Sequence, residues 1–170
     1  MTQTIQVKLT DQRCELGDAY ARKHLTTPPK VAVLSCEGMC LRGDVARRAA
    51  NLIAHELAPD RAVRVCHGGL LETSGGMRDL VERAEQVLLL DGCPLACGTR
   101  LLKAAFPEIK PTVAFTDRLF EFDRALFGVD EMAEAEIKAH ARTAAEKVIA
   151  EKLDGAPAEP PVAATPCSGR

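Results

Sequence analysis

The feature that most restricts the fold is a series of short apolar runs separated by segments with apolar residues at helical spacing. The run at 87–90 has no polar residue on either face, as expected for a strand buried on both sides of a parallel sheet. Strands joined by helices form right-handed βαβ units. The sequence therefore predicts an α/β fold with a small doubly wound, mainly parallel sheet of four to five strands, flavodoxin/Rossmann-like. The four clearest runs are 31–34, 62–65, 87–90 and 112–116.

The segments between these runs contain signals for helix starts. Asp44 is placed to cap a first helix and Ser74 to cap a second. We expect a third helix over 101–106 and a long one that Asp130 caps. A flavodoxin-like strand order, second-first-third-fourth, fits this arrangement.

Three regions differ in composition. Residues 1–29 read as a lead-in with a short strand around Ile5, Val7 and Leu9, where apolar and polar residues alternate. Residues 30–153 hold the predicted α/β domain. Residues 154–170 contain four Pro and four Ala with no aromatic residue, which predicts a disordered tail.

Charge and hydropathy exclude several function classes. The 22 basic and 24 acidic residues give a net charge of −2, so we expect no nucleic-acid partner. No apolar run approaches the ~20 residues that span a bilayer, and we expect no membrane partner. The first thirty residues contain no apolar block of secretory type, which favours a cytoplasmic protein.

Seven cysteines are the main functional signal, because an odd number in a reducing compartment favours metal or thiol chemistry over disulfides. Cys36, Cys66 and Cys93 follow the first, second and third predicted strands, whose carboxyl ends share one edge of a parallel sheet. Cys40 and Cys97 lie four residues after Cys36 and Cys93. We expect one Zn²⁺ bound by Cys36, Cys93 and Cys97, with Cys66 as fourth ligand and Cys40 in reserve. An iron–sulfur cluster on four of these thiolates is the alternative cofactor.

Other residues near these cysteines have a more ordinary interpretation. His67 is a further candidate ligand or a polar loop residue, and Asp91 either orients the loop that follows it or serves as a turn residue. Cys14 and Cys167 fall outside the predicted edge. No feature of the sequence identifies a protein partner beyond the metal ion.

The segment DGCPLACG at 91–98 resembles the DGC-domain family, which is named for Asp-Gly-Cys. The strand ending in Ser-Cys at 35–36 and the cysteine after the next strand support the resemblance, which covers roughly residues 30–118. It implies a small cytosolic protein whose cysteines bind zinc, with matching positions at Cys36, Cys66, Asp91, Cys93 and Cys97. After Cys36 the chain has Glu37, Met39 and Cys40 where the family has small and polar residues.

Two rival functions remain open at this stage. Cys36 and Arg42 have the C-x5-R spacing of tyrosine phosphatases and arsenate reductases, in which Cys36 would be the nucleophile. Glu37 and Asp44 oppose this interpretation, because their negative charges repel an oxyanion, so binding is favoured over catalysis. The second rival is a thiol-redox or metal-delivery protein that uses Cys93 and Cys97.

Overall fold

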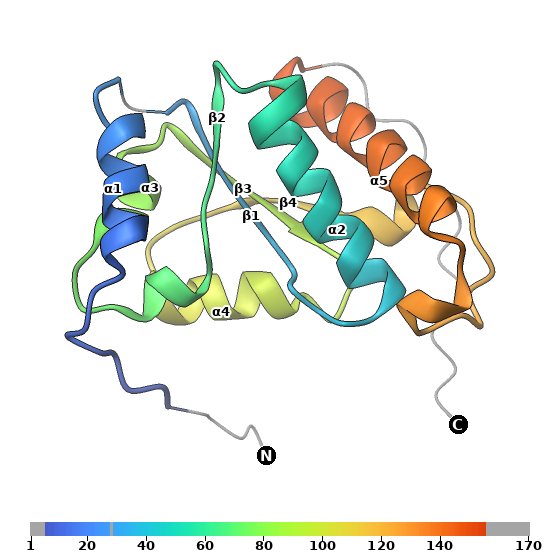
Figure 1. Ribbon diagram of the computed structural model, residues 1–170, viewed down its shortest axis with the longest axis horizontal. Helices are drawn as coiled ribbons and strands as arrows, with labels where there is room; N and C mark the ends of the chain where they lie inside the picture. Colours follow the sequence, from blue (N-terminus) through green and yellow to red (C-terminus); the bar gives the residue numbers. More distant parts are fainter. Residues whose placement is uncertain (1–5, 28, 156–170) are drawn as a thin grey trace.

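The computed structural model describes residues 6–27 and 29–155. Its centre is a four-stranded sheet in the order β2-β1-β3-β4, with every neighbouring pair parallel (Figure 1). The predicted α/β class and strand order are therefore confirmed. The strands are β1 (Val31–Ser35), β2 (Ala62–Arg64), β3 (Gln86–Asp91) and β4 (Thr112–Phe115).

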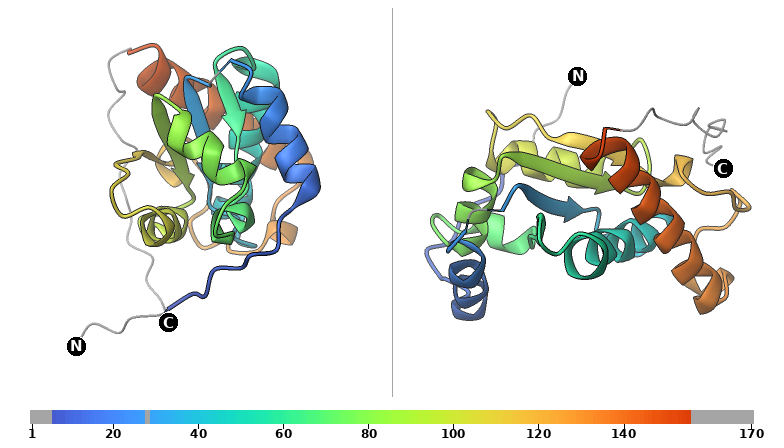
Figure 2. Two further views of the ribbon diagram at one scale, coloured as in Figure 1. Left: turned by 90° about the vertical axis from the view of Figure 1, so that its left-hand side faces the viewer. Right: turned by 90° about the horizontal axis from the view of Figure 1, so that it is seen from above.

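Helices cover both faces of the sheet (Figure 2). On one face lie α2 (Leu41–Leu52), extended by the π-helical turn Ile53–Leu57, and α5 (Glu134–Val148), extended by Ile149–Leu153. On the other face lie α1 (Glu15–His24), α3 (Gly76–Arg83) and α4 (Cys97–Ala105). Short 3₁₀ turns occupy Gly68–Leu71, Thr116–Arg118 and Val129–Glu131.

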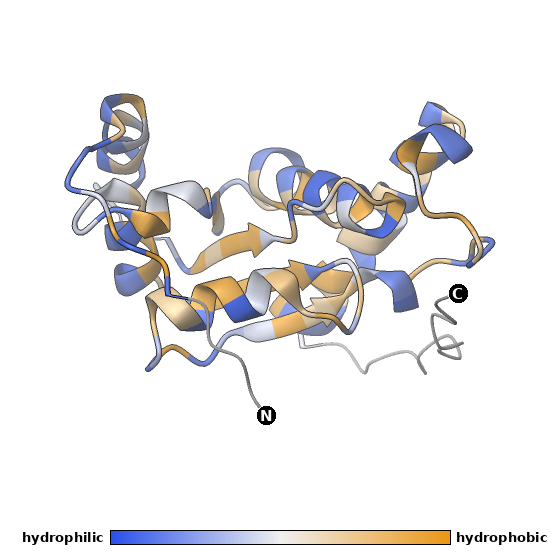
Figure 3. Ribbon diagram, turned by 90° about the horizontal axis from the view of Figure 1, so that it is seen from below, coloured by the Kyte–Doolittle hydropathy of each residue, from blue (hydrophilic) through white to orange (hydrophobic). Residues whose placement is uncertain are grey.

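The central strand β3 is buried on both faces, which accounts for its uninterrupted apolar sequence. Leu88 and Leu90 pack toward α2 and α5, whereas Leu89 packs toward α3 and α4. All three leucines are completely buried. The hydropathy colouring shows these apolar strands between the helical layers (Figure 3). Successive side chains of a strand point to opposite faces, so two helical layers require apolar residues at every position.

Helix starts differ from the sequence prediction. Helix α2 begins at Leu41, and Asp44 lies in its first turn rather than at its cap. The reason is a distant contact, in which the Leu41 N–H donates to the Phe127 carbonyl at 2.7 Å. Similarly, α3 is capped by Gly75 instead of Ser74, and Asp130 belongs to a separate 3₁₀ turn before α5.

The N-terminal segment before β1 also differs from the sequence prediction. Residues 6–9 are exposed and form no strand, and a single bridge pairs Thr10 with Glu72. Helix α1, which the sequence analysis did not predict, packs on α3 and buries Ala21. Ile5 and most of the predicted tail lie outside the described residues. No helix among the described residues is long and apolar enough to cross a bilayer.

Candidate functional site

The loops that follow β1 and β3 lie side by side at the carboxyl edge of the sheet (Figure 1). Ser35 pairs with Leu90 at the ends of these strands, and the Cys36 N–H donates to the Leu90 carbonyl at 2.8 Å. The loop 36–40 then leads into α2, and the loop 92–96 leads into α4. Cys36 and Cys40 lie in the first loop, whereas Cys93 lies in the second loop and Cys97 is the first residue of α4. Parallel pairing of neighbouring strands therefore brings the two C-x3-C pairs to one edge of the sheet.

Asp91 caps helix α4 from the end of β3. Its completely buried carboxylate accepts the Gly98 N–H at 2.8 Å, the Thr99 N–H at 3.2 Å and the Thr99 hydroxyl at 2.6 Å. The residue before the helix, Ala96, offers no side-chain cap and has a left-handed φ of 54°. Asp91 therefore satisfies the free amides of the first turn and fixes where Cys97 stands.

Glycines allow the backbones at this edge to approach closely. A Cβ on Gly92 would lie 2.7 Å from both the Arg42 carbonyl carbon and the Gly43 nitrogen. A Cβ on Gly43 would lie 2.8 Å from the Gly38 carbonyl oxygen. The loop 36–40, the start of α2 and the turn after β3 are thus in backbone contact, which accounts for the glycine of the Asp-Gly-Cys motif.

The Cys36 thiol is half-buried and electrostatically linked to the loop after β3. Burial raises its pKa, the charges of Cys97 and Asp91 raise it further, and the N–H groups of Gly38 and Gly92 oppose the shift. The thiol of Cys36 and the start of α4 therefore lie within electrostatic range of each other.

The Cys93 thiol is linked in the same way to the loop after β1. Burial raises its pKa, followed by the charges of Asp117, Cys40 and Cys97, while the Leu95 N–H opposes them. The charge of Cys97 thus affects the pKa of Cys36, and the charge of Cys40 affects the pKa of Cys93, as expected for thiols at one edge of the sheet.

Gly38 lies between the two sulfurs of the first pair. A Cβ on Gly38 would lie 3.3 Å from the Cys36 sulfur and 3.7 Å from the Cys40 sulfur. The absence of that atom leaves open the space between the two thiols.

The structure places Cys66 apart from this group. Cys66 is exposed and lines a cavity beside β2, and β1 separates β2 from β3. The six described cysteines are all free thiols. Among residues 6–27 and 29–155, no group of three or more His, Cys, Asp or Glu side chains is already arranged to hold a metal ion.

Comparison with known families agrees with the motif at the end of β3. A family model for the DGC domain matches residues 32–149. The chain belongs to the DGC domain family. No curated protein and no solved structure matches it.

In this DGC domain, Arg42 has a structural position. Its guanidinium donates to the Arg124 carbonyl at 2.9 Å and to the Leu126 carbonyl at 3.5 Å, and lies over the Phe122 ring. An arginine engaged in this way does not form the oxyanion cradle of a C-x5-R loop with Cys36. The geometry gives no support to the phosphatase or reductase alternative.

Sequence reasoning missed Asp117, which lies just after β4 at the same edge of the DGC domain. Its carboxylate is buried, and Oδ1 has no hydrogen-bond partner among the described residues. Burial raises the pKa of Asp117 despite the neighbouring guanidinium groups of Arg124, Arg118 and Arg42. A polar residue directly after a predicted strand is the signal that could have identified it.

His67 is more deeply buried than a loop histidine usually is, with 6% of its surface exposed. Burial lowers its pKa, and the charge of Arg64 adds to this, whereas Glu37, Asp91 and the Gly98 backbone oppose it. The imidazole of His67 is therefore neutral at pH 7.

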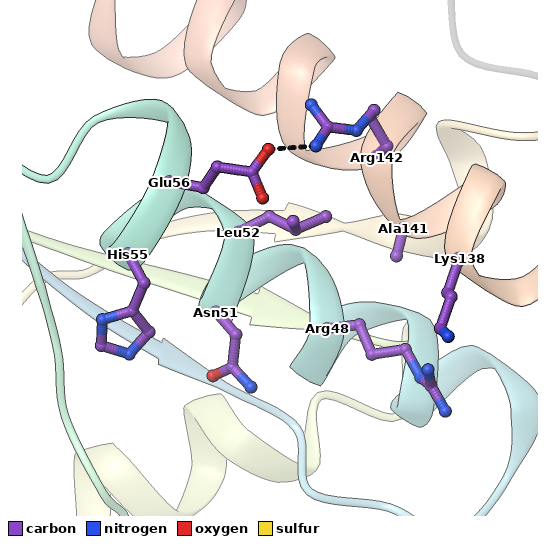
Figure 4. A pocket seen from close by; sticks show the side chains of 8 residues that line it. All are labelled: Arg48, Asn51, Leu52, His55, Glu56, Lys138, Ala141 and Arg142. Atoms are coloured by element: carbon purple, nitrogen blue, oxygen red, sulfur yellow. Dashed lines mark hydrogen bonds and ion pairs between the residues drawn. The ribbon is translucent and has the colours of Figure 1, made fainter.

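A second cavity of the DGC domain, of about 560 Å³, lies between α2 and α5 and contains no thiol (Figure 4). Its charged groups are largely paired, since Arg142 bonds Glu56, and Arg48 bonds Glu134. This pairing leaves the thiol edge as the stronger candidate site. The cavity is lined by Arg48, Asn51, Leu52, His55, Glu56, Lys138, Ala141 and Arg142.

Proposed function

We propose that this DGC domain binds Zn²⁺ at the carboxyl edge of its sheet, with Cys36, Cys93 and Cys97 as ligands and Cys40 as the fourth. The observation that supports this proposal is the parallel pairing of β1 with β3, which brings Cys36 and Cys40 beside Cys93 and Cys97 at one edge of the sheet. In agreement with this placement, the charge of Cys97 affects the pKa of Cys36, and the charge of Cys40 affects the pKa of Cys93. Thiolates are preferred ligands of Zn²⁺, and structural zinc sites are tetrahedral. Cys66, the fourth ligand predicted from the sequence, is the alternative to Cys40.

The four thiols are suitable zinc ligands, but they are not already arranged around a common point. Because the described residues hold no assembled three-ligand group, binding requires the two short loops to draw together. Both loops end at the start of a helix, so their far ends are fixed by α2 and α4. A bound Zn²⁺ would supply a positive charge that keeps the thiols deprotonated. The same four thiolates would suit an iron–sulfur cluster, which the brown colour of anaerobically purified protein would reveal.

We predict about one zinc per chain in the unaltered protein, because four thiolates satisfy one tetrahedral ion. Cys93→Ala should lose the metal and keep the fold, since the sheet has its own core. Metal analysis of anaerobically purified protein, with circular dichroism as the fold check, measures both. Cys40→Ala and Cys66→Ala identify the fourth ligand, because only the variant that removes this ligand should lower the zinc content.

Cys14→Ser is the matched control for these variants, because the Cys14 sulfur accepts the Gly17 N–H at the start of α1 and Cys14 is not a proposed ligand. Its zinc content should equal that of the unaltered protein. Full zinc content in Cys36→Ala or Cys93→Ala would show that the proposed site is wrong.

The proton chemistry gives a second prediction. Burial raises the pKa of Cys36 and of Cys93, so both metal-free thiols are protonated at pH 7 and become thiolates only at higher pH. Their alkylation rates should therefore rise at a higher pH in the folded chain than in the denatured chain. Zinc binding should release protons and weaken as the pH falls.

Mass spectrometry of the alkylated peptides at a series of pH values measures this for each thiol. The denatured chain is the control, because it has the same residues without burial. Identical pH profiles for Cys36 and Cys93 in the folded and denatured chains would contradict the prediction.

A further inference from the structure

Among the described residues, the large apolar side chains that are exposed occur in two places. Three of them lie in the N-terminal segment before β1. The other four surround the carboxyl edge of the sheet and are between 40% and 74% exposed; they are Met39, Leu95, Phe127 and Val129. We call these four the apolar rim. Single apolar residues on a surface are ordinary, whereas a group of them in one place indicates an interaction surface.

The apolar rim is one surface, although its members come from three segments. An antiparallel bridge joins Cys40 and Gly128, so Met39 lies opposite Val129. The loop after β3, which carries Leu95, touches the backbone at the start of α2, directly after the loop that carries Met39. The rim therefore extends across the edge that holds the two C-x3-C pairs.

One side of the rim is acidic. Segment 121–131, which we call the acidic flank, has four exposed carboxylate residues, Glu121, Asp123, Asp130 and Glu131. Its one basic residue, Arg124, is directed inward. The Arg124 guanidinium donates to the Asp117 carbonyl oxygen at 2.8 Å and lies 3.6 Å from the Asp117 carboxylate. The charge that this flank presents to a partner is therefore negative.

The other side of the rim is basic. Helix α4 begins at the edge, contains no acidic residue, and exposes Arg100 and Lys103, which we call the basic flank. Within the described part of the chain, neither of these side chains forms an ion pair. Their charges are therefore available to a partner.

A second copy of this chain matches both features of the surface. In a twofold pair both copies use the same patch, so the apolar rim meets itself and each acidic flank faces the basic flank of the other copy. The size is also suitable, since loops 36–40 and 92–96, the acidic flank and the first turns of α4 together reach the ~20–30 residues of one side of a standard interface. A net charge of −2 on each chain leaves little overall repulsion.

We propose that a second copy of this chain covers the carboxyl edge of the sheet through the apolar rim, with the acidic flank of each copy against the basic flank of the other. Pairing requires no metal. The pairing proposal and the zinc proposal can therefore fail separately.

Sedimentation equilibrium of the full-length protein, with a chelator and a thiol reductant present, tests this proposal. The reductant excludes disulfide-linked dimers. The 18.3 kDa chain should be in reversible equilibrium with a species of twice its mass. Phe127→Ser and Leu95→Ser should each raise the dissociation constant at least about tenfold, as expected when a central interface side chain is truncated.

Leu16→Ser is the matched control, because Leu16 is 84% exposed on α1, far from the start of α2 (Figure 1). It should leave the dissociation constant unchanged, and circular dichroism checks that each variant folds. A single monomeric species up to about 1 mM would overturn the proposal and assign the rim to a different protein. Unchanged dissociation constants in both Phe127→Ser and Leu95→Ser would also overturn it, because the copies would then meet elsewhere.

Arg100→Glu and Asp130→Lys test the arrangement of the flanks. Each single variant places like charges opposite each other in the pair and should weaken it. The double variant has opposite charges in exchanged positions, so it should pair more tightly than either single variant. A double variant that pairs no more tightly than the single variants would overturn the twofold arrangement.

Discussion

Replacement of Asp91 by alanine is expected to lower the free energy of unfolding by about 3 kcal/mol. The helix loses its cap, and buried donors are left without a hydrogen-bond partner. The carboxylate is completely buried and accepts the amides of Gly98 and Thr99 and the Thr99 hydroxyl. Alanine leaves these donors without a partner in a place with little room for water. The start of α4 should fray, and Cys97 should lose its fixed position.

Asp91→Asn is the matched comparison. Asparagine keeps one acceptor oxygen for the Gly98 N–H. Its NH₂ group then faces Thr99, whose hydroxyl can accept a hydrogen bond but whose N–H cannot. We expect the free energy of unfolding of Asp91→Asn to lie between that of the unaltered protein and that of Asp91→Ala. Urea unfolding followed by circular dichroism measures both. A change of less than about 0.5 kcal/mol in Asp91→Ala, the range of ordinary surface substitutions, would contradict this role.

The sheet was predictable because its signal is local and strong. The run at 87–90 required burial on both faces, and β3 has that environment. The order β2-β1-β3-β4, with β2 and β3 on either side of β1, is the flavodoxin-like order expected for a small doubly wound sheet. The placement of Cys36 and Cys93 at one edge is a direct consequence of this topology.

The helix starts were less predictable, because distant contacts determine them. Asp44 has the side chain of a cap, yet the Phe127 carbonyl accepts the first amide of α2, and Asp44 bonds Arg47 and Arg48 instead. Asp91 caps α4 from seven residues before Gly98, outside the local pattern of a helix cap. Helix α1 is capped by Cys14, which is not one of the usual capping residues, and only Ala21 of the helix is buried.

The choice between Cys66 and Cys40 as the fourth ligand of the proposed zinc site depends on distances that residue spacing in the sequence does not give. Cys66 follows β2, and β1 lies between β2 and β3. Strands are about 4.8 Å apart, so the ends of β2 and β3 are separated by about twice that distance. Cys40 instead shares a loop with Cys36 and affects the Cys93 thiol. The sequence contains the cysteines of the edge, but their distances depend on how the loops fold.

Gly92→Ala is expected to be at least as damaging as the loss of Asp91, with a decrease of about 3 kcal/mol or more in the free energy of unfolding, at the upper end of overpacking costs. The new Cβ would stand 2.7 Å from the carbonyl carbon of Arg42 and from the nitrogen of Gly43. These are backbone atoms of the first turn of α2, so no side-chain rotation can relieve the clash. The end of β3 must move away from α2, and the two cysteine loops must separate.

Gly68→Ala is the matched control, because a Cβ there meets the Cys66 sulfur at 3.6 Å, an ordinary van der Waals distance. It should leave unfolding by urea almost unchanged and leave the zinc content intact, whereas Gly92→Ala should reduce both stability and zinc. The comparison separates backbone contact from a general effect of adding a methyl group to a loop glycine. If Gly92→Ala is as stable as Gly68→Ala, then close contact between α2 and the turn after β3 does not hold the thiol edge together.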